Sequence, residues 1–76
     1  MRDLVLWLAR ELVEDREAVT VETIERDRST VFELTVAEDD LGRVIGRGGR
    51  TAKAFRTVLD TAARLQGRRA VLDILD

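Results

Sequence analysis

The 76-residue sequence contains no cysteine, histidine, proline or tyrosine, and its only serine is Ser29. Without histidine or cysteine, neither a Ser-His-Asp triad nor a Cys-His pair can form, and zinc lacks its usual nitrogen and sulfur ligands. The side chains left for chemistry are carboxylates, threonines and Lys53, and paired acids could still catalyse proton transfer or bind Mg²⁺. These absences weaken the enzyme hypothesis without excluding it, and we expect a non-enzymatic protein without a cofactor.

Long hydrophobic runs are also absent. The apolar run near the N-terminus, residues 4–9, is too short to span a bilayer, and neither a basic leader nor a cleavage site accompanies it. The lack of thiols is compatible with a reducing compartment. We expect a cytoplasmic protein without membrane contact, folded as one domain over residues 1–76, since a chain this short supports a single core.

The overall net charge of −2 conceals two segments of opposite charge. Residues 1–40 contain five Arg against twelve Asp and Glu, a net charge of −7. Residues 41–69 contain seven Arg and one Lys against Asp60 alone, a net charge of +7. An anionic partner such as a nucleic acid would be attracted to the second segment, so the low isoelectric point of 5.1 does not exclude one.

Hydrophobic periodicity predicts the order helix, strand, strand, helix, helix, strand. Residues 3–14 repeat apolar side chains at helical spacing. Residues 18–25 and 30–36 alternate as half-buried strands do, and residues 26–29 form the turn between them. Residues 69–75 are predicted to form the last strand.

A short helix and a long helix are predicted between the second and third strands. Asp39 and Asp40 are suited to cap the short helix, which ends at Gly46, and a Mg²⁺ site is the alternative role for these acids. The long helix covers residues 49–66 and ends at Gly67. On a helical wheel, one face of the long helix is mostly cationic and the other is predicted to lie in the core: Ala52, Phe55, Val58, Leu59, Ala62 and Ala63.

Side chains elsewhere have less specific roles. Phe32 and Phe55 are predicted to lie in the core. Trp7 lies at the edge of an apolar stripe, where core packing and a subunit interface are equally compatible with its position. Four arginines are predicted to be solvated or locally paired: Arg56, Arg64, Arg68 and Arg69.

The most informative motif is Val-Ile-Gly-Arg-Gly-Gly-Arg at residues 44–50, in the turn between the two central helices. A turn that starts and ends in glycine lets backbone N–H groups reach an anion without interference from Cβ atoms. The N-terminus of the following helix adds a partial positive charge, and Arg47 and Arg50 add full charges. Phosphate is the expected anion.

Three phosphate-binding motifs compete for these glycines. A P-loop would need Gly in place of Val44 and Lys in place of Arg50. A dinucleotide-binding fingerprint would need Gly in place of Thr51 and a preceding strand. The Gly-x-x-Gly pattern of a KH domain matches at Gly46 and Gly49, between two helices as that domain requires.

The length, the element order and residues 41–54, Leu-Gly-Arg-Val-Ile-Gly-Arg-Gly-Gly-Arg-Thr-Ala-Lys-Ala, resemble the small bacterial single-KH RNA-binding proteins of the KhpA family. The likeness covers nearly the whole chain. It implies an α+β fold of the type II KH class, in the order α-β-β-α-α-β, with three helices on one face of a three-stranded mixed sheet. One departure is Gly48, where relatives usually carry a polar side chain such as Gln.

The resemblance also implies a function and partners. The chain is expected to clamp short single-stranded RNA as an RNA chaperone or post-transcriptional cofactor, and to form a homodimer or a complex with a larger KH protein of the KhpB type. A rival hypothesis is a protein-interaction module that retains the fold and acts mainly through dimerisation. The residues expected to bind RNA are Arg43, Ile45, Gly46, Arg47, Gly48, Gly49, Arg50 and Lys53.

Overall fold

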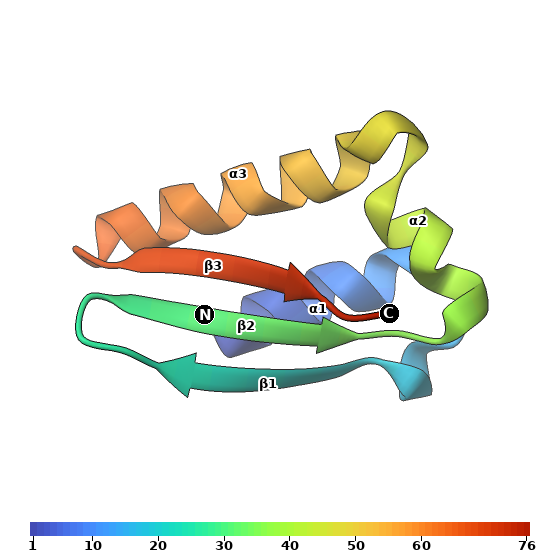
Figure 1. The fold of residues 1–76 in the computed structure, drawn as a ribbon, viewed down its shortest axis with the longest axis horizontal. Coiled ribbons are helices and arrows are strands. Elements are labelled where there is room, and N and C mark those ends of the chain that lie inside the picture. The colour runs from blue at the N-terminus through green and yellow to red at the C-terminus, as the bar shows by residue number, and fades with distance from the viewer.

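The computed structural model describes residues 1–76 and confirms the α+β class and the predicted order of elements (Figure 1). The helices and strands are α1 (Arg2–Leu12), β1 (Thr20–Glu25), β2 (Ser29–Thr35), α2 (Leu41–Ile45), α3 (Arg50–Leu65) and β3 (Arg69–Ile74). Short 3₁₀ turns cover Arg16–Ala18, Glu38–Asp40 and Arg47–Gly49. None of the helices combines the length and the apolar character needed to cross a bilayer.

The three strands form one mixed sheet with β2 at its centre. β1 is antiparallel to β2, and β3 is parallel to it. In β2, Thr30, Phe32 and Leu34 are buried and alternate with more exposed residues, because successive side chains point to opposite faces of the sheet. The helices therefore cover one face, with α1 behind the sheet and α3 along β3 in Figure 1.

The core lies between this covered face and the two long helices. Val5 and Ala9 of α1 and Phe55 and Leu59 of α3 pack with Phe32 of the central strand, and all five are at most 4% exposed. The predicted core positions of both phenylalanines are thus confirmed. α2 packs mainly against α3, so the turn between these helices stands at the end of the domain, away from the core (Figure 1).

The ends of the elements reflect local backbone chemistry. No non-glycine residue has a positive φ, so Asp27 and Arg28 form neither a type I′ nor a type II′ hairpin turn. At the end of α3, Gly67 adopts φ 68°, and the N–H groups of Gly67 and Arg68 donate to the carbonyls of Arg64 and Ala63 at 3.0 and 2.9 Å. This is the Schellman arrangement, and it confirms Gly67 as the residue that ends the helix.

The prediction that Val58 lies in the core is wrong. Its side chain is 45% exposed, whereas Ala52, Phe55, Leu59 and Ala63 are buried. Val58 instead faces the groove between α1 and α3, which no other element covers. The buried stripe of α3 is therefore narrower than its apolar face.

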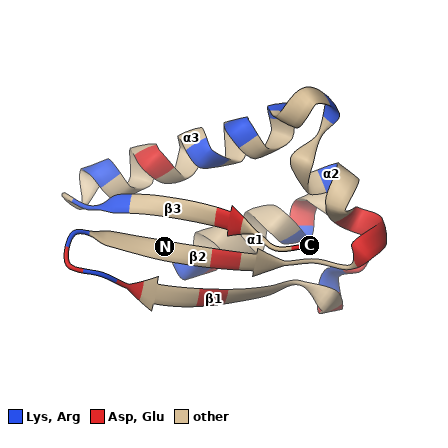
Figure 2. Ribbon diagram, in the orientation of Figure 1, with Lys and Arg blue, Asp and Glu red and all other residues tan.

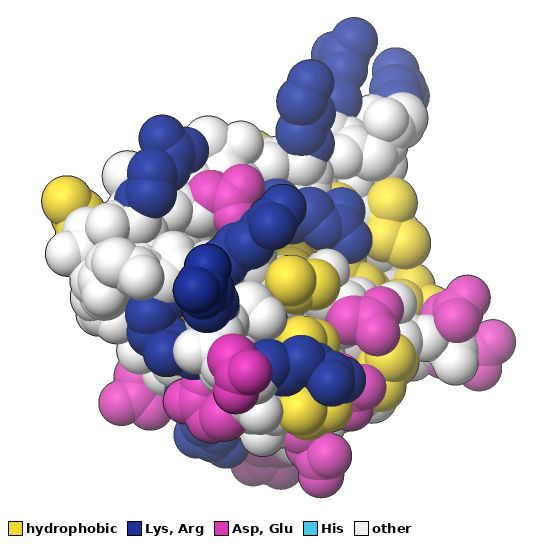
Figure 3. Space-filling view, turned by 60° about the vertical axis from the view of Figure 1, so that its left-hand side comes forward, with side chains coloured by type: hydrophobic (Ala, Val, Ile, Leu, Met, Phe, Trp, Pro, Cys, Tyr) yellow, Lys and Arg dark blue, Asp and Glu magenta, His cyan; other side chains and the backbone are white.

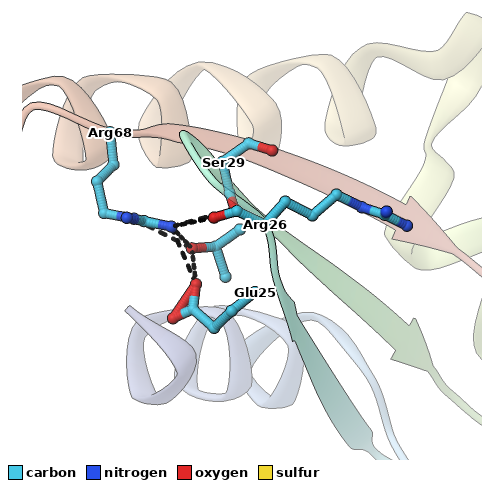
Figure 4. A network of polar contacts seen from close by, with 5 residues as sticks. Glu25, Arg26, Ser29 and Arg68 are labelled. Atoms are coloured by element: carbon cyan, nitrogen blue, oxygen red, sulfur yellow. Dashed lines mark hydrogen bonds and ion pairs between the residues drawn. The ribbon is translucent and has the colours of Figure 1, made fainter.

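Arg68 holds together one end of the sheet (Figure 4). Its Nη2 atom donates to the carboxylate of Glu25 at 3.0 Å, to the carbonyl of Ser29 at 3.1 Å and to the carbonyl of Arg26 at 3.3 Å. The hydroxyl of Thr30 accepts from the same guanidinium and donates to Glu25 at 2.6 Å. Arg68 is thus paired, but with the β1–β2 hairpin and not with its sequence neighbours.

Candidate nucleic-acid interface

The turn between α2 and α3 depends on three glycines with left-handed backbone angles. Gly46, Gly48 and Gly49 have φ values of 77°, 65° and 79°. The Gly49 N–H donates to the Gly46 carbonyl at 3.1 Å, which closes the turn. Arg47 and Gly48 lie exposed at its tip. Residues with a Cβ rarely adopt these angles, so the turn places bare backbone at the surface.

The glycines differ in what surrounds them. A Cβ on Gly46 would lie 2.2 Å from the Thr51 hydroxyl and 2.7 Å from the Thr51 backbone nitrogen, so Gly46 is required for the close approach of α3. A Cβ on Gly48 or Gly49 would meet no atom within 4 Å. The space beside these two glycines is therefore open to a ligand.

Three uncompensated cations surround the turn. Arg47, Arg50 and Lys53 are exposed, and none of them takes part in an ion pair or a side-chain hydrogen bond. Residues three apart on a helix lie on neighbouring parts of its surface. Figure 2 shows cationic positions in the turn and along α3. An anion that approaches the turn meets these charges together with the positive end of the α3 dipole.

Two other predicted site residues lie beside the turn, one with an exposed apolar side chain and one already in ion pairs. Ile45 is 40% exposed next to Gly46 and offers an apolar surface. Arg43 is already paired, because its guanidinium donates to the Asp40 carboxylate at 3.1 Å and to the Glu14 carboxylate. Arg43 therefore holds α2 against the end of α1, and a phosphate would have to compete with two carboxylates for it.

The prediction that Asp40 caps α2 is wrong, since no side chain makes a cap hydrogen bond there. Asp40 is 2% exposed and accepts hydrogen bonds from the backbone N–H groups of Glu14 and Asp15 at 3.2 and 3.1 Å. These N–H groups, first that of Asp15, and the Arg43 guanidinium lower the pKa of Asp40. No group of three potential ligands that could hold a metal ion is present, so nothing supports the Mg²⁺ alternative.

The lowered pKa of Asp40 predicts a defined dependence of stability on pH. A carboxylate whose pKa is lower in the folded state stabilises the fold above its ordinary pKa of 3.8 and loses this contribution as the pH falls through the folded value. We expect Asp40→Asn to unfold at lower urea concentration than the parent at neutral pH, and this difference to shrink below pH 3.8. Asp39→Asn, at an exposed neighbouring position, should match the parent throughout. A difference for Asp40→Asn that does not change with pH would contradict this role.

A groove between α3 and β3 was not predicted. It has a volume of about 250 Å³, and its lining includes Arg56, Leu59, Asp60 and Val71. Arg56 donates to the Leu72 carbonyl at 3.3 and 3.4 Å, beside the unpaired outer edge of β3. The sequence does contain a pattern from which this groove could have been inferred. Arg50, Lys53 and Arg56 are spaced three residues apart, which indicates that the cationic surface continues along α3 towards this edge.

Comparison with known proteins gives a consistent result along the whole chain. The family model described as KhpA/KhpB, KH domain, matches residues 2–74. The RNA-binding protein KhpA of Halalkalibacterium halodurans is 46% identical over 76 residues and 100% of both chains. The KhpA of Aquifex aeolicus is 43% identical over all of this chain and 96% of the relative. The KhpA of Borreliella burgdorferi is 40% identical over 97% of this chain and 90% of the relative.

No solved structure is significantly similar to this sequence. The family match and the three relatives nevertheless cover both the Gly46–Gly49 turn and the elements on either side of it. They agree with the α+β fold described above. The chain therefore belongs to the KhpA/KhpB family of KH domains.

Proposed function

We propose that this protein binds short single-stranded RNA and that the Gly46–Gly49 turn clamps the sugar-phosphate backbone. The observation that carries the proposal is the open backbone of Gly48 and Gly49, flanked by unpaired cations at the N-terminus of α3. A phosphate could approach the backbone there without displacing a side chain. The relatives named RNA-binding protein KhpA support the choice of ligand.

The same geometry suggests a separate role in RNA binding for each residue of the site. Arg47, Arg50 and Lys53 neutralise phosphates, Ile45 contacts a base, and Gly46, Gly48 and Gly49 shape the turn. We assign Arg43 a positioning role because it is held by two carboxylates. Bases that follow the clamped phosphates would reach the groove beside Arg56, where the edge of β3 offers unpaired backbone groups.

Such a clamp suits a chaperone or a post-transcriptional cofactor in the cytoplasm. A KH domain holds about four nucleotides, so one copy binds weakly and releases readily. A second KH domain on the same RNA raises the effective concentration and with it the apparent affinity. A homodimer, or a complex with a larger KH protein of the KhpB type, would supply that second domain.

The salt dependence of binding tests the clamp. If Arg47, Arg50 and Lys53 each neutralise one phosphate, the affinity for a ten-nucleotide oligouridylate should fall with a log–log slope of about −2 against salt concentration, at about −0.7 per phosphate. Fluorescence anisotropy at several KCl concentrations measures this slope. A slope near zero would contradict the phosphate clamp, and the same slope in Arg47→Ala would exclude that residue from it.

The groove between α1 and α3, here called the helical groove, supports the proposed association. It is an apolar groove of about 390 Å³, and its apolar lining residues are Trp7, Leu8, Leu12, Ala54, Phe55 and Val58. Trp7 is 57% exposed, which rules out the core alternative for this residue.

Beside this groove, an exposed stripe continues along α3. Ala54, Val58, Thr61 and Leu65 follow one another at spacings of four, three and four residues, and Leu65 is 86% exposed. This is the spacing with which two helices pack together. The stripe and the groove therefore fit a helix of a second KH domain.

Placing a charge on this stripe should prevent that packing. We expect Val58→Arg to shift the protein from dimer to monomer in sedimentation velocity, because an arginine in an apolar helix pair would be buried without a partner. Thr57→Arg, the same charge one residue earlier and turned away by about 100°, should leave the dimer intact. Equal masses for both variants would contradict a homodimer through the helical groove.

A further inference from the structure

The sheet face opposite the helices carries an ordered charge pattern. The strand register places Glu22, Glu33 and Asp73 side by side across β1, β2 and β3. Figure 2 shows an acidic position from each strand in this row, and β1 carries a second one, Glu25, at its end. None of the three residues in the row forms an ion pair. Like charges directly opposite each other destabilise a sheet, so the row costs stability in the isolated chain.

The next row on this face is apolar. Ile24, Val31 and Val71 lie in register two residues further along each strand, and Val71 is 43% exposed. No other part of the chain covers this row. A three-residue apolar row on an exposed sheet face gains from burial against another surface.

A cationic row follows on the other side of the apolar one. Arg26 and Arg69 flank Ser29 there, since Arg69 pairs with Ser29 in the strand register and the Arg26 N–H donates to the Ser29 carbonyl at 2.8 Å. In Figure 4 the Arg26 side chain extends away from Glu25, which is on the covered side. Figure 3 shows apolar side chains on this part of the surface, with cationic and acidic side chains around them.

We propose that this sheet face binds the same face of a second copy of this chain, in a contact separate from the helical groove. A two-fold axis that runs along the apolar row, across the strands, would pack the apolar row of one copy against the apolar row of the other. It would also place Glu22 opposite the partner's Arg26, and Asp73 opposite the partner's Arg69, with both pairs repeated by symmetry. Glu22 and Asp73 thereby gain the counter-charges that they lack in the monomer, while Glu33 between them faces the partner's Ser29.

The dimensions fit such a contact. Two residues of a strand span about 7 Å, so each charged row lies about 7 Å from the axis. Packed sheets lie about 10 Å apart with their strands nearly aligned, a gap that an arginine and a carboxylate side chain bridge together. Three strands make a small face, so we expect weak association at roughly 0.1 to 1 mM protein.

The test uses Val58→Arg protein, in which only the sheet face is free to associate, and it measures association by sedimentation equilibrium. Adding Glu22→Arg places an arginine opposite the partner's Arg26, and adding Arg26→Glu instead places two glutamates opposite each other. We expect each variant to weaken self-association at least about tenfold, because apposed like charges are strongly unfavourable. Glu17→Arg, an exposed site outside the sheet, should have no such effect.

Mixing the two variants gives the decisive result. In the mixed pair, each new arginine or glutamate faces an opposite charge, so the mixture should associate at least as strongly as Val58→Arg alone. Circular dichroism of each variant verifies folding. A mixture that associates no better than its separate components would overturn the proposal, as would an absence of association in Val58→Arg at 1 mM, about the upper end of the expected range. RNA binding plays no part in this measurement, so the outcome is independent of the clamp.

Discussion

Replacing Arg47 and Gly48 together with Asp is expected to abolish RNA binding and to leave the fold intact. The change removes one cation and adds two anions where the phosphate approaches. Each unit of charge about 4 Å from a phosphate is worth about 1 kcal/mol in water, so three units weaken binding by about 3 kcal/mol, more than a hundredfold. Gly48 has φ 65° and open space around it, so Asp there costs only about 1 kcal/mol of backbone strain.

A matched control is available at the other end of α3. Arg64→Asp with Gly67→Asp makes the same charge change, and Gly67 has the same kind of backbone, with φ 68° and open space. The two sites are separated by the length of α3, roughly 24 Å, which exceeds twice the Debye length at physiological salt. We expect the control to lower RNA affinity less than about threefold by anisotropy.

The outcome separates a clamp from a plain structural turn. If the Arg47 and Gly48 double variant is folded by circular dichroism and binds oligouridylate as well as the control does, the turn has only a structural role. Arg68, although distant from the turn, is unsuitable as a control. Its guanidinium is bonded to Glu25 and to the hairpin carbonyls, so its loss would disturb the sheet.

The elements that the sequence predicted well are those set by local signals. The alternation in residues 30–36 identifies β2 because the strand lies between a covered and an open face, so its two sets of side chains differ in burial. Gly67 ends α3 because a positive φ is needed for the Schellman hydrogen bonds, whatever lies nearby. The Gly46–Gly49 turn was found for the same reason.

The position of Val58 could not be read from a helical wheel. The wheel orders residues around α3, but it does not show how wide a surface the neighbouring elements cover. α1 and the sheet together cover only the stripe through Phe55 and Leu59, which leaves Val58 and Trp7 at the surface. The groove between α1 and α3 is open because no further element packs over it.

Two of the ion pairs could not be predicted because they join distant parts of the chain. Arg43 pairs with Glu14, 29 residues away, and Arg68 pairs with Glu25, 43 residues away. In both cases an arginine of the cationic segment is paired with an acid of the anionic one. The net charge of residues 41–69 therefore overstates the cations free for a ligand, and three that form no ion pair, Arg47, Arg50 and Lys53, lie together at the turn.

Gly46→Ala should be the most disruptive single substitution in the turn. The backbone of Gly46, with φ 77° and ψ 170°, lies in a region that only glycine adopts readily. The new Cβ would also lie 2.7 Å from the backbone nitrogen of Thr51, which cannot rotate away as a side chain can. We expect a loss of about 3 kcal/mol in the free energy of unfolding, or a rearranged turn that no longer binds RNA.

Gly42→Ala provides the comparison, because it adds the same methyl group four residues earlier. Gly42 lies inside α2, and a Cβ there meets no atom within 4 Å, so alanine should stabilise the protein by about 0.5 to 1 kcal/mol through helix propensity. Urea unfolding and RNA anisotropy on both variants measure the contrast. Suppose that Gly46→Ala unfolds at the same urea concentration as the parent and binds RNA with the same affinity. The turn would then accommodate a Cβ at residue 46, and the close contact between Gly46 and Thr51 would not be needed for RNA binding.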